Sequence, residues 1–458
     1  MRVVICGAGQ VGFGIAERLA AEQNDVSIID SDARQIQMVT EQLDVRGIVG
    51  WGAHPDVLAR AGIDQADMII AVTLHDEVNM VACQVAHALF NVPTKVARIR
   101  AQTYLAPEWS DLFSRDHLPI DVVISPEIEV GEMVLRRLSL PGAIDTVSFA
   151  DGAIVAAGVV CREDCPIVDT PLNQLTQLFP EAQATIVAVN RDGKTIVPTA
   201  LEQLQVGDVA YFVTQADQVQ RTLSIFGYDE LPSQRILIAG SGNIGYYVAK
   251  ELELRNPLAR IKLIEKNRAK AQEAAEQLNR TVVLNGDALD QSILDEAGVG
   301  DADIMVALTN DDRINILSCL LARQLGARRI LALLNEQGYA AFARGLGIDA
   351  HVNPRQITVS RVLQHVRRGR IRGVHALLDG SGELIEAEAL ETSPLVGKQL
   401  RDLDTLDGLR IGAILRDGKV MQPRGDMVVR AHDRVVLFAL AERIKRVEQL
   451  FRVALEFF

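Results

Sequence analysis

The chain has 458 residues, of which 48% are hydrophobic, so it is long enough to form about two to four domains with proper cores. Its formal net charge of -13 argues against general nucleic-acid binding, because that function favours a basic face. The N-terminus opens directly into an apolar run without a leader, and no apolar run approaches the roughly 20 residues that span a bilayer. We therefore expect a cytoplasmic protein that meets a membrane only through a partner.

The first informative segment is a glycine-rich turn that follows the apolar run 3–6. Its residues are Gly7, Ala8, Gly9, Gln10, Val11 and Gly12. In a nucleotide-binding unit, the first glycine permits a tight turn, the second lets the backbone approach a pyrophosphate, and the third lets the next helix pack on the sheet. Asp30 ends the next apolar run, where a carboxylate accepts hydrogen bonds from ribose hydroxyls and disfavours a 2′-phosphate. This combination predicts a nucleotide site.

The next segments continue the same unit. Apolar runs at 46–49, 68–72, 96–99 and 122–124 alternate with helical stretches such as 79–89, which predicts a parallel, doubly wound sheet. Thr73 stands at the carboxyl end of the fourth strand, where it either lines the pocket or satisfies a local turn. We expect Asp76 and Asn79 to cap the following helix. Arg98 and Arg100 share one face of the fifth strand's end and either clamp phosphates or make surface ion pairs.

A smaller, strand-rich region follows a helix start at Ser125-Pro126. Residues 188–195 loosely match a P-loop, but a strand pattern continues after them, and Asp192-Gly193 predicts a hairpin instead. Cys161 and Cys165 lack the second ligand pair of a structural zinc site, so the sequence predicts no metal site.

The second half repeats the first. After the apolar run 236–239 comes a second glycine turn, made of Gly240, Ser241, Gly242, Asn243, Ile244 and Gly245. Glu265 takes the place of Asp30, and Thr309 that of Thr73. Residues 302–309 match 66–73, and residues 416–419 match 191–194. Asn353-Pro354 predicts the start of another linker helix.

The predicted fold class is therefore α/β, with two doubly wound, parallel-sheet (Rossmann-like) nucleotide-binding domains, each followed by a small α+β C-terminal domain. We expect nucleotide-binding domains at 1–125 and 232–353. The regions 126–231 and 354–458 would each contain a linker helix and a small domain.

The two halves differ at the fifth strand, where the repeat places Leu334 opposite Arg98 and Glu336 opposite Arg100. The first site therefore suits a more anionic ligand such as ATP or ADP, and the second suits NAD(H) or binds more weakly. The basic run 361–372 either contacts an acidic partner or anionic lipid, or forms a solvated helix face.

Catalytic residues are not evident in the sequence. It contains neither a His-Glu-x-x-His zinc motif nor a Gly-x-Ser-x-Gly nucleophile turn. This favours a non-enzymatic sensor, with an NAD-dependent oxidoreductase as the main alternative.

These blocks together resemble tandem members of the family of domains that regulate potassium conductance, the RCK domains. The resemblance rests on residues 6–12, 67–73, 77–86 and 97–100, and on the large-small-large-small order. It implies a regulatory subunit, peripheral on the inner face of the cell membrane, that docks on a Trk-type potassium-translocating protein and assembles as a dimer or tetramer ring. A regulator of a different cation channel or exchanger is the other alternative.

The resemblance also implies ligands, namely NAD(H) and ATP or ADP. It places the first site at residues 7–11, Asp30, Thr73, Leu74 and Arg98. It places the second site at residues 240–244 and Glu265.

Overall fold

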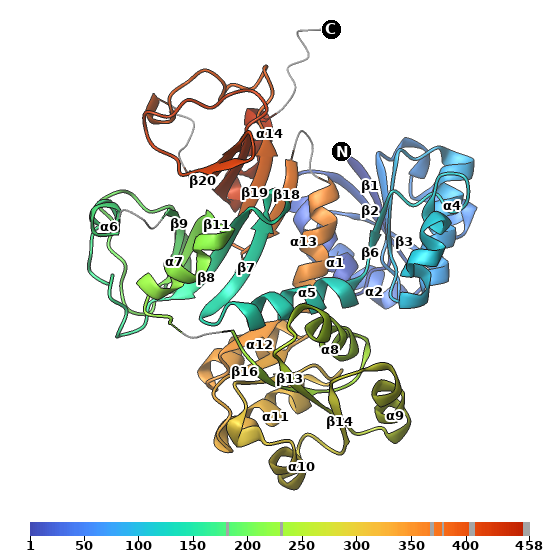
Figure 1. The fold of residues 1–458 in the computed structure, drawn as a ribbon. Helices are drawn as coiled ribbons and strands as arrows, with labels where there is room; N and C mark the ends of the chain where they lie inside the picture. The colour runs from blue at the N-terminus through green and yellow to red at the C-terminus, as the bar shows by residue number, and fades with distance from the viewer. Residues whose placement is uncertain (180–182, 230–231, 367–370, 378–379, 403–407, 452–458) are drawn as a thin grey trace.

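The computed structural model describes residues 1–179, 183–229, 232–366, 371–377, 380–402 and 408–451. These residues form two six-stranded parallel sheets and two five-stranded antiparallel sheets, arranged as four lobes around two central helices (Figure 1). The predicted large-small-large-small order and α/β fold class are confirmed. Within the described residues, no helix is long and apolar enough to cross a membrane.

The first parallel sheet has the strand order β3-β2-β1-β4-β5-β6. Its strands are β1 (Arg2–Cys6), β2 (Asp25–Asp30), β3 (Arg46–Val49), β4 (Met68–Ala71), β5 (Thr94–Arg98) and β6 (Val122–Ile124). Its helices are α1 (Gln10–Ala21), α2 (Ala33–Gln42), α3 (Pro55–Arg60) and α4 (Asp76–Phe90). The central strands are apolar at nearly every position because helices cover both faces of the sheet. The order reverses direction between β1 and β4, which is where ligands bind in such sheets.

The second parallel sheet repeats this plan in the order β14-β13-β12-β15-β16-β17. Its strands are β12 (Arg235–Ala239), β13 (Arg260–Glu265), β14 (Val282–Asn285), β15 (Ile304–Ala307), β16 (Ile330–Leu333) and β17 (Ala350–Val352). Its helices are α8 (Asn243–Arg255), α9 (Arg268–Gln277), α10 (Gln291–Glu296), α11 (Asp312–Gln324) and α12 (Gln337–Gly345). The connection between the last two strands differs: α12 stands here, whereas two 3-10 segments, Gln102–Leu105 and Pro107–Phe113, occupy it in the first half.

The two small lobes also share one topology. The first contains β7 (Ala143–Phe149), β8 (Ile154–Val160), β9 (Ala184–Arg191), β10 (Lys194–Ile196) and β11 (Val209–Gln215), with helices α6 (Leu172–Leu178) and α7 (Val219–Ile225). The second contains β18 (Ile371–Ala376), β19 (Gly382–Glu388), β20 (Leu409–Arg416), β21 (Lys419–Met421) and β22 (Arg434–Leu440), with helix α14 (Ile444–Leu450). A common apolar core joins the two sheets, with Phe149 and Tyr211 from one and Phe438 from the other.

Local details of the small lobes confirm the hairpin prediction. Asp192 and Gly193 both have positive φ, 51° and 78°, between β9 and β10. This is the backbone of a two-residue hairpin turn, so residues 188–195 do not form a P-loop. Arg191 makes a two-pronged ion pair with buried Asp208, and Arg416 makes the same pair with Asp433 in the second lobe.

The two linker helices, α5 (Pro126–Ser139) and α13 (Pro354–Val366), exchange partners between the halves. Apolar residues of α5, including Val130 and Val134, belong to the core of the second parallel-sheet domain. Apolar residues of α13, including Val359 and Leu363, belong to the core of the first. The helices therefore lie at the centre of the molecule, and each half completes the core of the other (Figure 1).

The contact of α13 with α1 and the contact of α5 with α8 differ in which helix carries a glycine. Where α13 crosses α1, Gly14 makes room for the helix, since a Cβ there would lie 3.0 Å from Val359. Where α5 crosses α8, the sizes are reversed, because Gly131 on α5 makes room for the ring of Tyr247 on α8. Each helix therefore fits one partner in shape.

Candidate functional site

In the glycine loop between β1 and α1, the fold requires glycine at two positions but not at a third. Gly7 has φ +107°, which disfavours any other residue, and a Cβ on Gly12 would collide with the carbonyl oxygen of Gly7. Gly9 has an ordinary φ of −66°, and a Cβ there would meet no atom within 4 Å. The structure of the free protein therefore leaves room for a side chain at Gly9, and the predicted role of this glycine in admitting a pyrophosphate stays a prediction.

Asp30 fixes this loop. One carboxylate oxygen accepts the backbone N–H of Ala8 at 2.7 Å, and the other accepts that of Asp32 at 2.8 Å. Ala8 itself is fully buried. The ribose role of Asp30 stays a prediction, and the structure shows that its carboxylate holds the end of β2 against the glycine turn.

A pocket of about 500 Å³ opens beside the loop. Of the predicted residues, those that line it are Gly7, Gly9, Gln10, Val11, Asp30, Thr73, Leu74 and Arg98. The second half also contributes, through Asn335 after β16 and through Pro354, Arg355 and Thr358 at the start of α13. Sequence reasoning missed these second-half residues because it treated each repeat as a complete unit. It also missed Trp51, a half-exposed aromatic residue after β3.

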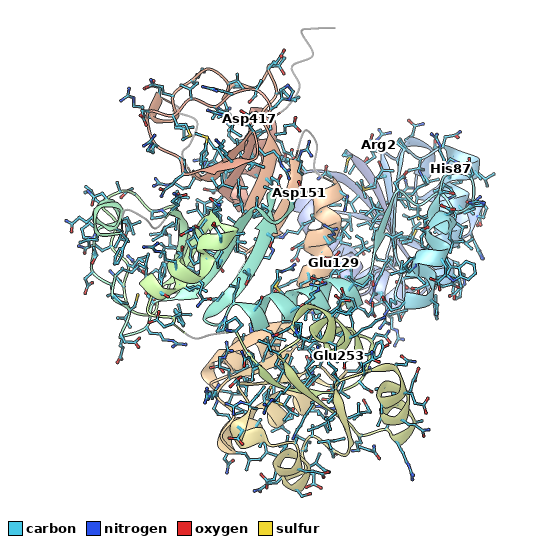
Figure 2. All side chains as sticks on the ribbon, in the orientation of Figure 1. Arg2, His87, Glu129, Asp151, Glu253 and Asp417 are labelled. Atoms are coloured by element: carbon cyan, nitrogen blue, oxygen red, sulfur yellow. The ribbon has the colours of Figure 1, made fainter. Side chains whose placement is uncertain are left out.

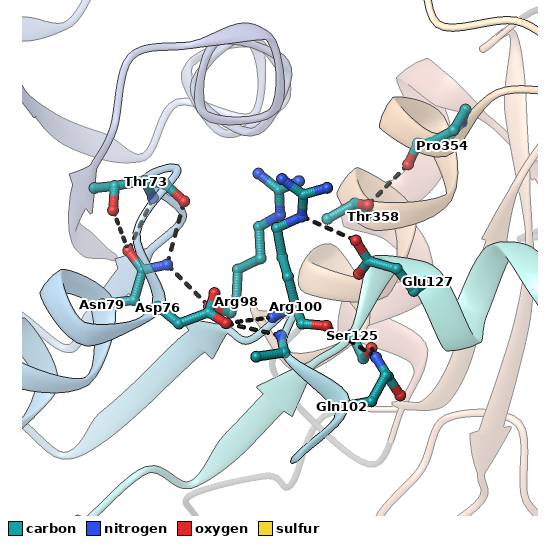
Figure 3. A network of polar contacts seen from close by, with 11 residues as sticks. Thr73, Asp76, Asn79, Arg98, Arg100, Gln102, Ser125, Glu127, Pro354 and Thr358 are labelled. Atoms are coloured by element: carbon teal, nitrogen blue, oxygen red, sulfur yellow. Dashed lines mark hydrogen bonds and ion pairs between the residues drawn. The ribbon is translucent and has the colours of Figure 1, made fainter. Parts of the chain in front are cut away.

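Thr73 belongs to a polar network that joins the carboxyl ends of β4 and β5 (Figure 3). The side-chain oxygen of Asn79 accepts the backbone N–H of Thr73 at 2.9 Å and its hydroxyl at 2.7 Å. The amide nitrogen of Asn79 donates to the carbonyl oxygen of Arg98 at 2.9 Å. The network thus holds Thr73 and Arg98 side by side at the pocket edge.

The prediction that Asp76 and Asn79 cap α4 is wrong. His75 occupies the N-cap position, and Asp76 is the first helical residue. The Asp76 carboxylate instead accepts the backbone N–H groups of Arg100 and Ala101 at 2.9 and 2.8 Å. Both side chains point across to the neighbouring strand because β4 and β5 end at the same edge of the sheet.

Arg98 and Arg100, the two arginines predicted at the end of the fifth strand, have different surroundings. Arg98 lines the pocket, and its Nε is buried with no hydrogen-bond partner. Burial and the neighbouring Arg100 lower the pKa of the Arg98 guanidinium. Arg100 is exposed and its Nε donates to Glu127, on the first turn of α5, at 2.9 Å. The ion-pair alternative therefore describes Arg100, whose contact with Glu127 is drawn in Figure 3, whereas the phosphate role of Arg98 stays a prediction.

The second glycine loop has the same geometry as the first. Gly240 has φ +99°, a Cβ on Gly245 would collide with Gly240, and a Cβ on Gly242 would meet no atom within 4 Å. Asn243 is the first residue of α8, and Ile244 packs against the second core. Thr309 and Asn315 reproduce the Thr73–Asn79 bonds, at 2.9 and 2.7 Å.

Glu265 fixes the second loop more tightly than Asp30 fixes the first. One carboxylate oxygen accepts both the backbone N–H and the hydroxyl of Ser241 at 2.8 Å, and the other accepts the N–H of Asn267 at 2.8 Å. Burial opposes ionisation, but these hydrogen bonds hold the pKa of Glu265 below its usual range.

The second site lacks the arginine of the first. The prediction that Leu334 stands opposite Arg98 and Glu336 opposite Arg100 is wrong by one residue, because the equivalent strand pairs place Ala332 opposite Ala97. Leu333 is the counterpart of Arg98, since its carbonyl oxygen accepts the amide of Asn315 as that of Arg98 accepts the amide of Asn79. Asn335 is the counterpart of Arg100, since its N–H donates to Asp312 as that of Arg100 donates to Asp76. Of the basic run, Arg367, Arg368 and Arg370 lie outside the described residues. Arg361 on α13 pairs with Glu129, and Arg372 on β18 pairs with Glu388, so these two do not share a solvated helix face.

Comparisons with known proteins agree with this architecture. The TrkA-N domain model matches residues 3–126 and 236–354, and the TrkA-C domain model matches 157–227 and 384–452. The chain is 76% identical over 458 residues to the Trk system potassium uptake protein TrkA of Azorhizobium caulinodans, with 100% of both chains covered. It is 39% identical to the protein of that name from Halomonas elongata, again with 100% of both chains covered.

Solved structures with this fold include a crystal structure of the GsuK RCK domain. It superposes with a TM-score of 0.61 at 21% identity and covers 98% of this chain and 94% of that chain. The GsuK channel bound to NAD gives a TM-score of 0.60 at 20% identity, covering 98% of this chain and 78% of that one. The predicted tandem RCK architecture is thereby confirmed.

Proposed function

The chain belongs to the family of Trk system potassium uptake proteins named TrkA, and from this premise we propose that it is a cytoplasmic, nucleotide-sensing regulatory subunit. In this proposal it docks on the inner face of the cell membrane against a Trk-type potassium-translocating protein. Nucleotide binding then changes the conformation that the membrane partner meets.

One observation carries the proposal: the first pocket is built from both halves of the chain. Its floor comes from the first parallel-sheet domain, and Pro354, Arg355 and Thr358 come from the linker helix of the second half. A nucleotide that binds better to one relative position of these parts shifts the population toward that position. Typical coupling of about 1–3 kcal/mol changes such an equilibrium by roughly 5- to 150-fold.

The residues support different ligands at the two sites. Arg98, with its unpartnered Nε, suits the terminal phosphates of ATP or ADP. The second site has Glu265 for a ribose and Leu333 in place of that arginine, which suits NAD(H). Neither assignment needs a bond in the nucleotide to break.

Exposed apolar residues support self-association. Val81 on α4 is 47% exposed, and its repeat counterpart Leu317 on α11 is 53% exposed. Trp109 and Phe342 are also exposed, each in the connection between the last two strands of its sheet. Apolar side chains repeated on matching surfaces favour contact with further copies of the chain, as a dimer or tetramer ring would make.

Arg98→Ala is expected to weaken ATP binding by roughly 10- to 150-fold, because a charge-assisted hydrogen bond contributes about 1.5–3 kcal/mol. NADH binding should change less, since it lacks a terminal phosphate. Titration calorimetry with each nucleotide measures both losses. Arg100→Ala is the matched control, because Arg100 pairs with Glu127 outside the pocket, and it should leave ATP affinity within a few-fold. Equal losses for ATP and NADH in Arg98→Ala would assign Arg98 to a phosphate that both ligands share.

Deletion of the gene is expected to lower potassium uptake and to slow growth at limiting potassium in a strain without a parallel copy. The wild-type protein should restore both. A folded Gly9→Asp, Gly242→Asp double variant should restore uptake and growth, but potassium transport in its presence should respond abnormally to ATP and NADH. Normal uptake in the deletion strain would contradict the Trk assignment. Altered transport of another cation would then favour a different channel or exchanger, and steady NADH turnover with a small substrate would favour an oxidoreductase.

A further inference from the structure

A second cavity, of about 510 Å³, lies where the linker helices meet the two small sheets. Its walls come from α5, β7, the start of α13 and β18, so both halves contribute. Figure 2 places Glu129 and Asp151, two of its lining residues, near the centre of the molecule between the lobes. The cavity shares no lining residue with the first nucleotide pocket.

The carboxylates that line this cavity already have partners. Asp145 pairs with His375 at 3.0 Å, and Glu129 pairs with Arg361 at 3.0 Å. Asp151 and Glu386 both pair with Arg434, at 2.6 Å. Each of these carboxylates therefore already has a hydrogen-bonded or ion-pair partner in the cavity wall, and Asp145 also attracts the guanidinium groups of Arg136 and Arg137.

Two cationic groups in the wall are incompletely paired. Arg136 and Arg137 stand on the last turns of α5, and the Nε of each is buried without a hydrogen-bond partner. Arg137 is only 5% exposed, and one of its terminal nitrogens donates to the carbonyl oxygen of His351. Burying an unsatisfied guanidinium N–H is costly unless a ligand or water meets it.

We propose that this cavity is a binding site for a small phosphate-bearing anion, held by the guanidinium groups of Arg136 and Arg137. Arginine presents planar N–H pairs that match phosphate oxygens, and a bound anion would satisfy the two buried Nε groups. The volume lies in the range of small-molecule sites and accommodates ligands from inorganic phosphate to a mononucleotide.

Helix α13 connects this cavity to the first nucleotide pocket. Pro354, Arg355 and Thr358 face the nucleotide pocket, whereas Gln356, Ile357 and Ser360 face the cavity. An anion bound against one face of α13 would restrict the position of the helix, and this would change how its opposite face meets a nucleotide. The anion and the nucleotide should therefore change each other's affinity by the same factor. This coupling rests on the proposed nucleotide site, whereas the binding of the anion does not.

The test uses the full chain with both glycine loops blocked by Gly9→Asp and Gly242→Asp. Calorimetric titrations with inorganic phosphate, pyrophosphate and AMP show which form of phosphate binds. We expect saturable binding of at least one probe, weakened tenfold or more by Arg136→Gln. Arg268→Gln, which removes an exposed arginine from α9, is the matched control and should leave the affinity unchanged. Circular dichroism and thermal unfolding verify that each variant folds.

Three outcomes would overturn the site: no saturable binding of any probe, binding that survives both Arg136→Gln and Arg137→Gln, or binding present in the unmodified chain and lost when the glycine loops are blocked. The last would assign the anion to the nucleotide sites. In the unmodified chain, the bound probe should shift ATP affinity several-fold. An anion site without such a shift would contradict the coupling through α13 while leaving the site itself established.

Discussion

Gly9→Asp is expected to lower nucleotide affinity at the first site by about 100-fold or more while leaving the fold intact. The backbone at Gly9 is ordinary and a Cβ there meets no atom within 4 Å, so the free protein accommodates the side chain. A bound pyrophosphate would instead lie against it, and two like charges about 4 Å apart repel by roughly 4 kcal/mol at an effective dielectric constant of about 20. Calorimetry with ATP and NADH, together with thermal unfolding, measures both effects.

Gly12→Ala is the matched control for this prediction. It lies three residues further on, but its Cβ would collide with the carbonyl oxygen of Gly7. The variant should therefore lose about 1–3 kcal/mol of stability, as overpacked sites do. Unchanged ATP and NADH affinity in a folded Gly9→Asp variant would show that the loop is not a phosphate site. A melting temperature depressed as strongly by Gly9→Asp as by Gly12→Ala would show that Gly9 is structural.

The sequence was sufficient to predict the sheets, because their signals are local. The apolar run 68–72 became β4, which is buried at every position, since strands buried on both faces of a sheet must be apolar throughout. The short run 122–124 became the edge strand β6. The glycine loops were predictable for a similar reason. Positive φ at Gly7 and the close packing of Gly12 are requirements of the turn itself, which few other residues meet.

The sequence could not predict contacts that depend on how distant segments meet. Asp76 is the first residue of α4 and Asn79 lies in its first turn, so capping was the natural expectation. The Asp76 carboxylate instead bonds the backbone N–H groups of Arg100 and Ala101, just after β5, and the Asn79 side chain bonds Thr73 and the carbonyl oxygen of Arg98. The same limit explains the missed part of the pocket. Arg355 lies more than 300 residues from the first glycine loop and reaches it only because the linker helices exchange between the halves.

This exchange of linker helices leads to the second prediction. Gly131→Val is expected to destabilise the protein by about 1–3 kcal/mol, because its side chain would overlap the ring of Tyr247 where α5 crosses α8. Tyr247→Ala removes the ring, so adding it to Gly131→Val should recover part of the loss. The double variant would carry a large residue on the linker helix and a small one on its partner, as Val359 and Gly14 already do in the other pair.

Chemical unfolding of the two single variants and the double variant gives the coupling energy between positions 131 and 247, which we expect to be about 0.5–3 kcal/mol. Tyr247→Phe is the control, because it keeps the ring but removes the 2.7 Å hydrogen bond from the hydroxyl to Glu132. It separates the effect of that bond from the effect of packing. If the stability losses of Gly131→Val and Tyr247→Ala simply add, the two positions are not coupled energetically, and side-chain size does not determine which helix α5 packs against. Strong coupling would instead mean that the reversed sizes hold α5 on the second domain and α13 on the first, which is the arrangement that brings Arg355 into the first pocket.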